Sequence, residues 1–340
     1  MVLRTLALVS FAGAIAVLPG LTAVAQNSKL PDLPHRSVRL APELEIRIAE
    51  LRDRLNVATR AKNTHAQAVI LNRIGALYYT HADAADALNA FVQTLTLVRK
   101  FNQPAAEATA LCDVAASHFA LGHAEEALDA YKGALPLWRS AGNKDHEAAT
   151  LGDIGEVFRA LNDPDEALHF DLQSLPLHIE AGNRAGQAAV LNNIGLVYFA
   201  RHDRKKALDY FNQALSIYQA LDNKAGKATT LNNIGVVHNQ FGERQKALEL
   251  FSMALTLLKE IGDQKGQAIT LNNMGLAYAH LGDAARALAC YNQAIPAYQA
   301  VGDQEGFEAA TRNIHALYAD RRNSAALATQ AAVNGKNILP

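Results

Sequence analysis

Three pairs of adjacent asparagines stand inside stretches that otherwise have the composition of a helix. They occur in LNNIGLVYFA, LNNIGVVHNQ and LNNMGLAYAH, which begin at Leu191, Leu231 and Leu271. A carboxamide both donates and accepts hydrogen bonds, so it can hold the N–H and C=O groups of a peptide backbone whatever the side chains are. Asparagine is a mediocre helix former and is seldom buried. Its recurrence at one position therefore indicates a purpose.

The asparagine pairs belong to a repeat of 40 residues. Leucines mark the repeat in unbroken register: Leu71, Leu111, Leu151, Leu191, Leu231 and Leu271. Sixteen residues after each of these leucines stands an alanine that is followed by another leucine. A fixed period of this length is typical of a solenoid of stacked repeats.

Each repeat has the pattern of two helices. In the fourth repeat, Leu191, Gly195 and Tyr198 lie on one apolar helical face, and a second apolar face runs from Ala207 to Leu215. Turns that contain Gly, Asn or Asp separate the helices, since these residues end one helix and cap the next. We expect the small residue on the first helix to face the alanine on the second.

This order of small and aromatic residues resembles the tetratricopeptide repeat. In the fourth repeat the resemblance is carried by Leu191, Ile194, Gly195, Tyr198, Ala207, Phe211 and Ala214. The length of 40 residues resembles the longer variety found in kinesin light chains, Pins-type adaptors and bacterial sensor proteins. The resemblance covers residues 64–320, about six full repeats and a partial seventh. It implies an all-α fold, a right-handed α-solenoid superhelix of helix-turn-helix repeats.

The resemblance has local departures. Asp171 replaces the aromatic residue of the third repeat's second helix, and His118 and His238 replace a tyrosine of the first helix. Because the tyrosine position is a packing position, we expect both histidines to be packed residues rather than ligands or bases.

The N-terminus has the pattern of a signal peptide over residues 1–25. Arg4 precedes an apolar stretch, a Pro-Gly break follows, and Ala23-Val24-Ala25 forms a small-x-small cleavage site. The alternative is a retained membrane anchor. We expect a secreted or periplasmic bacterial protein, with no stable membrane insertion after cleavage.

Three further segments flank the repeats. We predict a flexible leader over residues 26–41, where prolines are frequent, and an N-terminal capping helix over 42–63. A terminal cap is needed because the first repeat would otherwise expose its apolar end. Residues 321–340 are predicted to form a partial helix and a tail.

The sequence offers little that could perform catalysis. Its 12 histidines follow no metal-ligand spacing, and no phosphate-binding loop, GxSxG or Rossmann glycine pattern occurs. Asp153 and Glu156 form a pair at i, i+3 that we expect on a solvated face. Cys112 and Cys290 lie more than four repeats apart, too far to form a disulfide with each other. We therefore predict no cofactor and no metal.

The net charge of −1 disfavours nucleic acid as a partner. A protein or an extended peptide segment fits the asparagines better. On a helical wheel Leu191 and Gly195 face one side, whereas Asn192 and Asn193 face the other. The resemblance implies that the first helices line a concave groove, in which asparagines at the position of Asn193 hold an extended peptide.

The candidate peptide-binding residues lie on the first helices of the later repeats. They are Asn192, Asn193, Leu196, Phe199, Asn232, Asn233, Val236, Asn239, Asn272, Asn273, Leu276 and Asn313. In the earlier repeats Arg73, Asp113 and Asp153 take the position of Asn193, so the groove there is expected to bind differently or not at all.

Two interpretations of the asparagines stay open: they bind a peptide, or they bond one another and stiffen the solenoid. The first predicts an exported scaffold that binds proteins or peptides without catalysis. The alternatives are a regulatory or sensor module, whose effector domain lies on another chain or downstream, and an enzyme. Homo-oligomerisation is left open by the sequence.

Overall fold

The computed structural model of the protein describes residues 42–81 and 83–319. All regular secondary structure in these two ranges is helical, without any strand. The predicted class, an all-α solenoid of helix-turn-helix repeats, is confirmed. The predicted signal peptide over 1–25, the leader over 26–41 and the tail over 321–340 lie outside the described residues.

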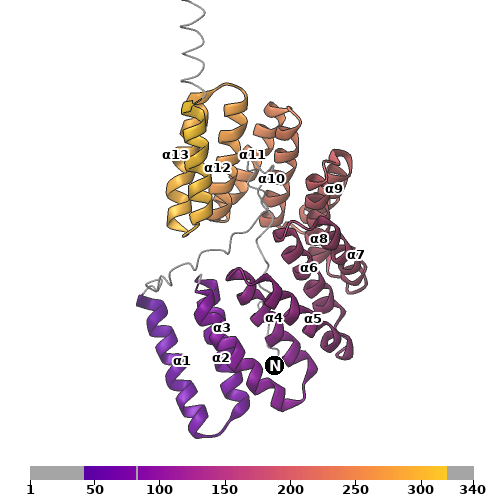
Figure 1. The fold of residues 1–340 in the computed structure, drawn as a ribbon, viewed down its shortest axis with the longest axis vertical. Coiled ribbons are helices and arrows are strands. Elements are labelled where there is room, and N and C mark those ends of the chain that lie inside the picture. Colours follow the sequence, from indigo (N-terminus) through magenta and orange to yellow (C-terminus); the bar gives the residue numbers. More distant parts are fainter. Residues whose placement is uncertain (1–41, 82, 320–340) are drawn as a thin grey trace, which may run out of the picture. The chain divides into compact units, whose positions relative to one another are not determined.

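The chain divides into two compact units, and the boundary falls between Val190 and Leu191 inside α8 (Arg184–Ala200). The described part of the N-terminal unit contains α1 (Pro42–Arg60), α2 (Thr64–Thr80), α3 (Ala84–Val98), the 3-10 helix η1 (Arg99–Phe101), α4 (Pro104–Ala120), α5 (Ala124–Ser140), α6 (Lys144–Ala160), α7 (Pro164–Glu180) and the start of α8 (Figure 1). The described part of the C-terminal unit contains the rest of α8, then α9 (Arg204–Ala220), α10 (Lys224–Gln240), α11 (Arg244–Glu260), α12 (Gln264–His280), α13 (Ala284–Ala300) and a further helix over 304–319.

Short turns of constant length set these helix boundaries. The turn between α11 and α12 shows the mechanism: Gly262 adopts a φ of 72°, which suits a residue without a Cβ atom. The next residue, Asp263, accepts a hydrogen bond from the backbone N–H of Gly266 at 2.9 Å. This cap satisfies a donor that has no partner inside the helix. The same left-handed residue and Asp or Asn cap recur at most other turns.

The two helices of a repeat pack as a tight hairpin around a glycine. A Cβ atom added at Gly235 on α10 would lie 2.6 Å from the ring of Phe251 on α11. Gly195 meets Phe211 in the same way. The prediction that this small residue faces the alanine of the second helix holds at Gly155, where an added Cβ atom would lie 3.3 Å from the carbonyl oxygen of Ala167. At Gly235 the nearest atoms belong to the aromatic ring one turn further on. The ring is buried completely, and so holds the hairpin together mainly through apolar burial.

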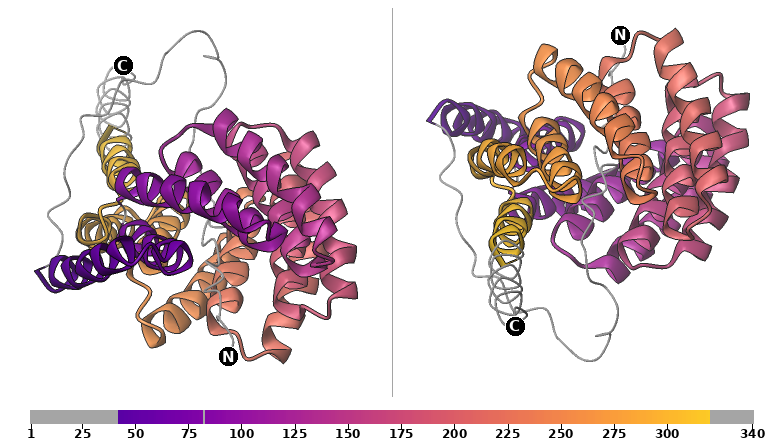
Figure 2. Two further views of the ribbon diagram at one scale, coloured as in Figure 1. Left: turned by 90° about the horizontal axis from the view of Figure 1, so that it is seen from below. Right: turned by 90° about the horizontal axis from the view of Figure 1, so that it is seen from above.

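Hairpins follow one another in chain order within each unit, as the two further views show (Figure 2). Contacts between α3 and α4, and between α11 and α12, join successive repeats. At the start of the repeats, α1 packs on α2 through Leu44, Ile48 and Leu51, which are buried in one cluster with the first hairpin. None of the helices in the described part of the chain is long and apolar enough to cross a membrane.

Candidate peptide-binding surface

The asparagines of the candidate surface lie on the first helices of the C-terminal unit. Six of them are buried, with at most 7% of their surface exposed: Asn192, Asn232, Asn233, Asn239, Asn272 and Asn273. Asn193 and Asn313 are half-buried. These side chains are thus less exposed than we expected of an open groove.

Hydrogen bonds join the asparagines of neighbouring repeats in a diagonal ladder. In each rung the asparagine at the position of Asn193 donates its Nδ2 to the Oδ1 of the asparagine at the position of Asn192 one repeat earlier. The three rungs are Asn233 to Asn192 at 3.2 Å, Asn273 to Asn232 at 3.2 Å, and Asn313 to Asn272 at 3.0 Å. The side chains therefore bond across the repeats, as the structural interpretation predicts. This bonding does not test peptide binding, which stays a prediction.

A threonine that the sequence analysis did not consider supports one rung. The hydroxyl of Thr230 lies 3.3 Å from Asn192 Oδ1 and 2.9 Å from the carbonyl oxygen of Gly226. A hydroxyl has one proton, so it donates to one of these acceptors at a time. The signal was present in the sequence, because threonine stands at the same position as Thr150, Thr230 and Thr270.

Helix α10 carries three buried amide atoms that have no hydrogen-bond partner among the described residues. They are Nδ2 of Asn232, Oδ1 of Asn233 and Oδ1 of Asn239. The first two are complementary: Asn232 uses its oxygen in the ladder and leaves a donor, whereas Asn233 uses its nitrogen and leaves an acceptor. An unpaired buried polar atom costs about 1–3 kcal/mol. An acceptor placed at Asn232 Nδ2 and a donor placed at Asn233 Oδ1 would each remove one of these costs.

The apolar members of the candidate surface are packed between successive repeats. Leu196 belongs to a buried cluster with Phe211 and Val237, and Val236 belongs to the next one with Phe251. Phe199 is half-buried and contacts both clusters. Leu276 is buried in a third cluster. Leu196, Val236 and Leu276 therefore lie beneath the candidate surface, and Phe199 is its most accessible apolar side chain.

Comparison with known proteins identifies the fold family. The model of the tetratricopeptide repeat matches residues 106–180, 170–220, 186–260 and 226–300, which together cover more than half of the 340 residues. The chain belongs to the tetratricopeptide-repeat family. No curated protein matches the sequence.

Solved tetratricopeptide-repeat structures share the fold at low sequence identity. The apo form of the quorum sensor NprR from B. thuringiensis is 17% identical, with a TM-score of 0.65 over 82% of this chain and 79% of that chain. Aspartyl phosphate phosphatase F from Bacillus subtilis is 12% identical, with a TM-score of 0.59 over 78% of this chain and 74% of that chain. A Rap protein complexed with competence and sporulation factor is 13% identical, with a TM-score of 0.57 over 82% of this chain and 87% of that chain.

The tetratricopeptide repeats of the N-terminal unit carry charges where the later repeats carry the ladder. Asn72 donates its Nδ2 to Asp113 Oδ2 at 2.7 Å, so one rung exists here too. The next rung is missing, because Cys112 stands at the position of Asn72 and its sulfur lies 3.4 Å from the Thr150 hydroxyl. Arg73 is exposed.

Burial changes the acidity of the two aspartates in this row. It raises the pKa of Asp113 to about 6, although the hydrogen bond from Asn72 lowers it. Burial raises the pKa of Asp153 to about 8; the charge of Glu156 adds to this effect and that of Arg159 opposes it. The pair of Asp153 and Glu156, which we expected on a solvated face, is in fact half-buried.

The histidines and cysteines behave as packed residues of tetratricopeptide repeats. His238 is buried, as predicted, and its Nδ1 lies 2.6 Å from Glu243 Oε2. Burial lowers the pKa of His238. His118 is half-buried. Cys112 and Cys290 are free cysteines in the structure.

Proposed function

We propose that this tetratricopeptide-repeat protein is an exported scaffold that binds a protein or an extended peptide along the first helices of its C-terminal unit. The observation that carries the proposal is the unpaired donor of Asn232 beside the unpaired acceptor of Asn233 on α10. A peptide unit in an extended segment supplies the complementary acceptor and donor. Recognition of this kind requires no catalytic group.

The ladder supports this proposal because it holds the amides in place before a ligand arrives. Each carboxamide has two faces for hydrogen bonding. When the neighbouring repeat binds one face of the carboxamide, the orientation of the other face is fixed as well. Less free energy is then spent on ordering the site when a peptide binds. The structural and the binding interpretations of the asparagines are therefore compatible. Because the contacts go to backbone groups, the site would tolerate many peptide sequences.

A displayed library of random peptides, selected on the purified protein, tests the proposal. We expect the selected peptides to bind Asn232→Ala and Asn233→Ala about tenfold or more weakly than the parent protein, measured by titration calorimetry. Asn212→Ala serves as the matched control, since Asn212 is exposed on the second helix α9. Binding that is equal in all four proteins would contradict the proposal.

A further variant separates the ladder from the binding site. Asn192→Ala removes the acceptor of one rung and leaves the two unpaired atoms of α10 in place. It should lower the unfolding temperature more than Asn212→Ala does and weaken peptide binding less than Asn232→Ala does. If peptide affinity instead follows thermal stability across all the variants, the asparagines have only a structural role.

Export rests on the sequence pattern of residues 1–25, with the cleavage site before Gln26. The test is expression of the full chain in a bacterial host, followed by fractionation and N-terminal sequencing. We expect a mature protein that begins at Gln26 outside the cytoplasm. An uncleaved chain retained in the cytoplasm would remove export from the proposal and leave the binding function untouched.

A further inference from the structure

The third repeat, formed by α6 and α7, has a polar core. On α7 the buried positions hold Asp171, Ser174 and His178. At the corresponding positions of the fifth repeat, α11 holds Phe251, Ala254 and Leu258. The third repeat therefore lacks the aromatic residue that holds each of the other hairpins together. At these positions its helices are joined by polar contacts, beside the stacked rings of Phe158 on α6 and Phe170 on α7, whose centroids lie 5.5 Å apart.

Asp171 and Arg159 provide the main polar contact. Asp171 is fully buried, and its Oδ2 accepts a hydrogen bond from Arg159 Nη1 at 2.6 Å. A Cβ atom added at Gly155 would lie 2.8 Å from Asp171 Oδ1, so this carboxylate occupies the place of the ring. Asp171 Oδ1 and Arg159 Nη2 are buried and make no hydrogen bond with any other described residue. A single ion pair, only partly satisfied, thus replaces a packed ring.

Arg159 also lies within reach of two more carboxylates on α6. Glu156 precedes it by three residues and Asp153 by six, so all three side chains lie within two helical turns. The charge of Arg159 lowers the pKa of Asp153 and of Asp171, although burial is the larger effect and raises both, to about 8 and about 7. One cation therefore serves several acidic groups, and it cannot neutralise them all.

The charged neighbours of these two aspartates lie on α6. Arg159 and Glu156 of α6 face Asp171. The same two residues act on Asp153, and Asp153 and Asp113 of α4 act in turn on Tyr79 of α2. On α7 the next titratable core residue after Asp171 is His178.

We propose that the third repeat is a proton-controlled joint, in which Arg159 divides its charge between the buried Asp171 and the carboxylates Asp153 and Glu156. When Asp171 takes up a proton from the solvent, its hairpin no longer contains a buried negative charge. Arg159 then acts more strongly on Asp153 and Glu156. The core of the hairpin and the charge on the first-helix face of α6 change together.

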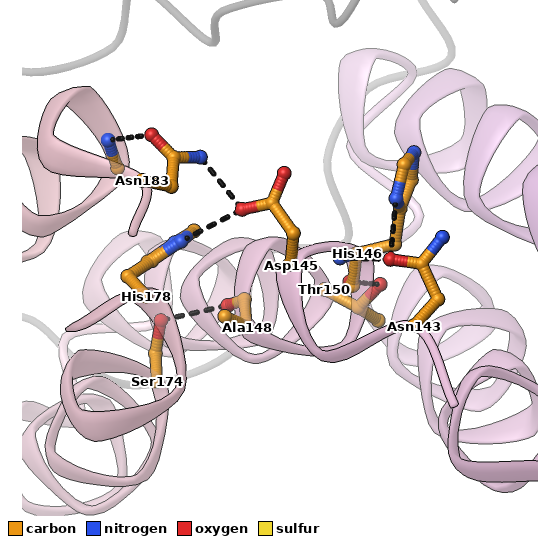
Figure 3. A network of polar contacts seen from close by, with 9 residues as sticks. Asn143, Asp145, His146, Ala148, Thr150, Ser174, His178 and Asn183 are labelled. Carbon is orange, nitrogen blue, oxygen red and sulfur yellow. Dashed lines mark hydrogen bonds and ion pairs between the residues drawn. The ribbon is translucent and has the colours of Figure 1, made fainter. Parts of the chain in front are cut away.

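A second polar network ties the far end of the joint to the next helix (Figure 3). The Asp145 carboxylate on α6 lies between two partners: His178 Nδ1 at 3.2 Å and Asn183 Nδ2 at 2.6 Å. Asn183 in turn accepts a hydrogen bond from the backbone N–H of Gly186 at 2.8 Å, which caps the start of α8. A displacement of α7 against α6 would therefore reach the first turn of α8.

The direction of the pH effect follows from Asp171. Its folded pKa lies above the unfolded value of about 3.9, so its contribution to stability is complete below that value and is lost as the pH rises through about 7. His178 acts in the opposite direction: burial lowers its pKa, so its contribution is lost as the pH falls below about 6.5. A test between pH 6.5 and 8.5 therefore isolates the carboxylates.

Hydrogen exchange measured by mass spectrometry tests the joint. After correction for the intrinsic exchange rate, the protection of amides in α6 and α7 should fall between pH 6.5 and 8.5, by up to about tenfold per pH unit for each proton released. Amides in α10 and α11 are the internal reference, because Phe251 fills the core there. A constant ratio of protection between the two hairpins would overturn the proposal.

Titration of the Asp153 carboxyl carbon by NMR tests the division of charge. In Asp171→Asn, Arg159 loses its charged partner and acts more on Asp153, so the Asp153 titration should shift to lower pH. Asp171→Phe, which restores the ring of the other repeats, should give the same shift and covers the case that the first variant fails to fold. Asp129→Asn is the control, because it removes one charge at an exposed position of α5. An Asp153 titration that is the same in all folded variants would refute the proposal.

Discussion

The first helices of the two units differ in the charge that they carry at the position of Asn193. In the C-terminal unit this position holds asparagines such as Asn233 and Asn273, which are neutral and donate to the previous repeat. In the N-terminal unit it holds Asp113 and Asp153, whose pKa values are raised by burial. The backbone arrangement is the same helical hairpin in both cases. The two units therefore place a carboxyl and a carboxamide at the same position of one hairpin.

The difference appears first in the direction of the hydrogen bonds. Asn72 donates to Asp113 in the next repeat, whereas Asn192 accepts from Asn233 in the next repeat. A carboxylate only accepts, so it fixes the direction of its rung and offers no donor for another contact. A carboxamide uses one atom in the ladder and retains a complementary one. In the described part of the chain, successive rungs between carboxamides thus occur in the C-terminal unit, whereas the rung of the N-terminal unit ends on a carboxylate.

The largest expected effect comes from moving the polar core of the third repeat into the fifth. Phe251→Asp should destabilise the C-terminal unit by about 4 kcal/mol or more, since it removes a buried ring and buries a charge. The residue at the position of Arg159 is Asn239 there, so no cation is available as a partner. Urea unfolding followed by hydrogen exchange of α10 and α11 measures the loss. A small effect would show that the ion pair of the third repeat is dispensable as well.

Removing a central rung of the ladder should have a smaller effect. Asn192→Ala deletes the acceptor used by Asn233 and approached by Thr230, and we expect a loss of about 1–3 kcal/mol in the free energy of unfolding. Denaturant titration measures it, with Asn212→Ala as the exposed control. If the two variants have the same stability, the rungs contribute nothing and the difference between the units is one of binding only.

The charge at the asparagine position should make the N-terminal unit sensitive to pH. The folded pKa of Asp153, about 8, lies above its unfolded value of about 3.9, so its contribution is complete at low pH and is lost as the pH rises through 8. At pH 9 the free energy of unfolding of Asp153→Asn should therefore exceed that of the parent protein by about 1–2 kcal/mol, and at pH 5 the two should differ little. Unfolding measured at both pH values tests this. An equal gain at pH 5 would point to packing rather than charge.

Much of the fold could be predicted from the sequence because each repeat has the same spacing of apolar residues and turn residues. The sequence predicts the ends of the helices from the period of 40 residues, the turn residues and the two apolar faces. These predicted ends lie within a few residues of the ends of α10 and α11. The position of Gly235 predicts a close approach of two helices. Its actual neighbour, Phe251, depends on side-chain direction, which spacing alone does not define.

The site was harder to predict for a physical reason. The sequence suggests columns of asparagines, but the stagger between successive helices decides that Asn233 bonds to Asn192 and not to another member of its own column. The ion pair of Arg159 and Asp171 joins the two facing helices of a hairpin through side chains that are 12 residues apart in the sequence. Such contacts, and the raised pKa of a buried carboxyl, arise from packing that no single helix encodes.

The smallest expected effect lies at the last described rung. Asn313 is half-buried and makes one ladder bond, so Asn313→Ala should cost about 0.5–1 kcal/mol, measured by denaturant titration. In a solenoid, stability is approximately a sum of repeats and nearest-neighbour interfaces. The loss should therefore add to that of Asn192→Ala to within about 0.5 kcal/mol, because the two rungs share no residue. Asn192→Ala combined with Asn233→Ala should not add, since both remove the same bond. Additivity in both pairs would mean that the asparagines act separately, and the ladder would then be no more cooperative than the isolated rung of the N-terminal unit.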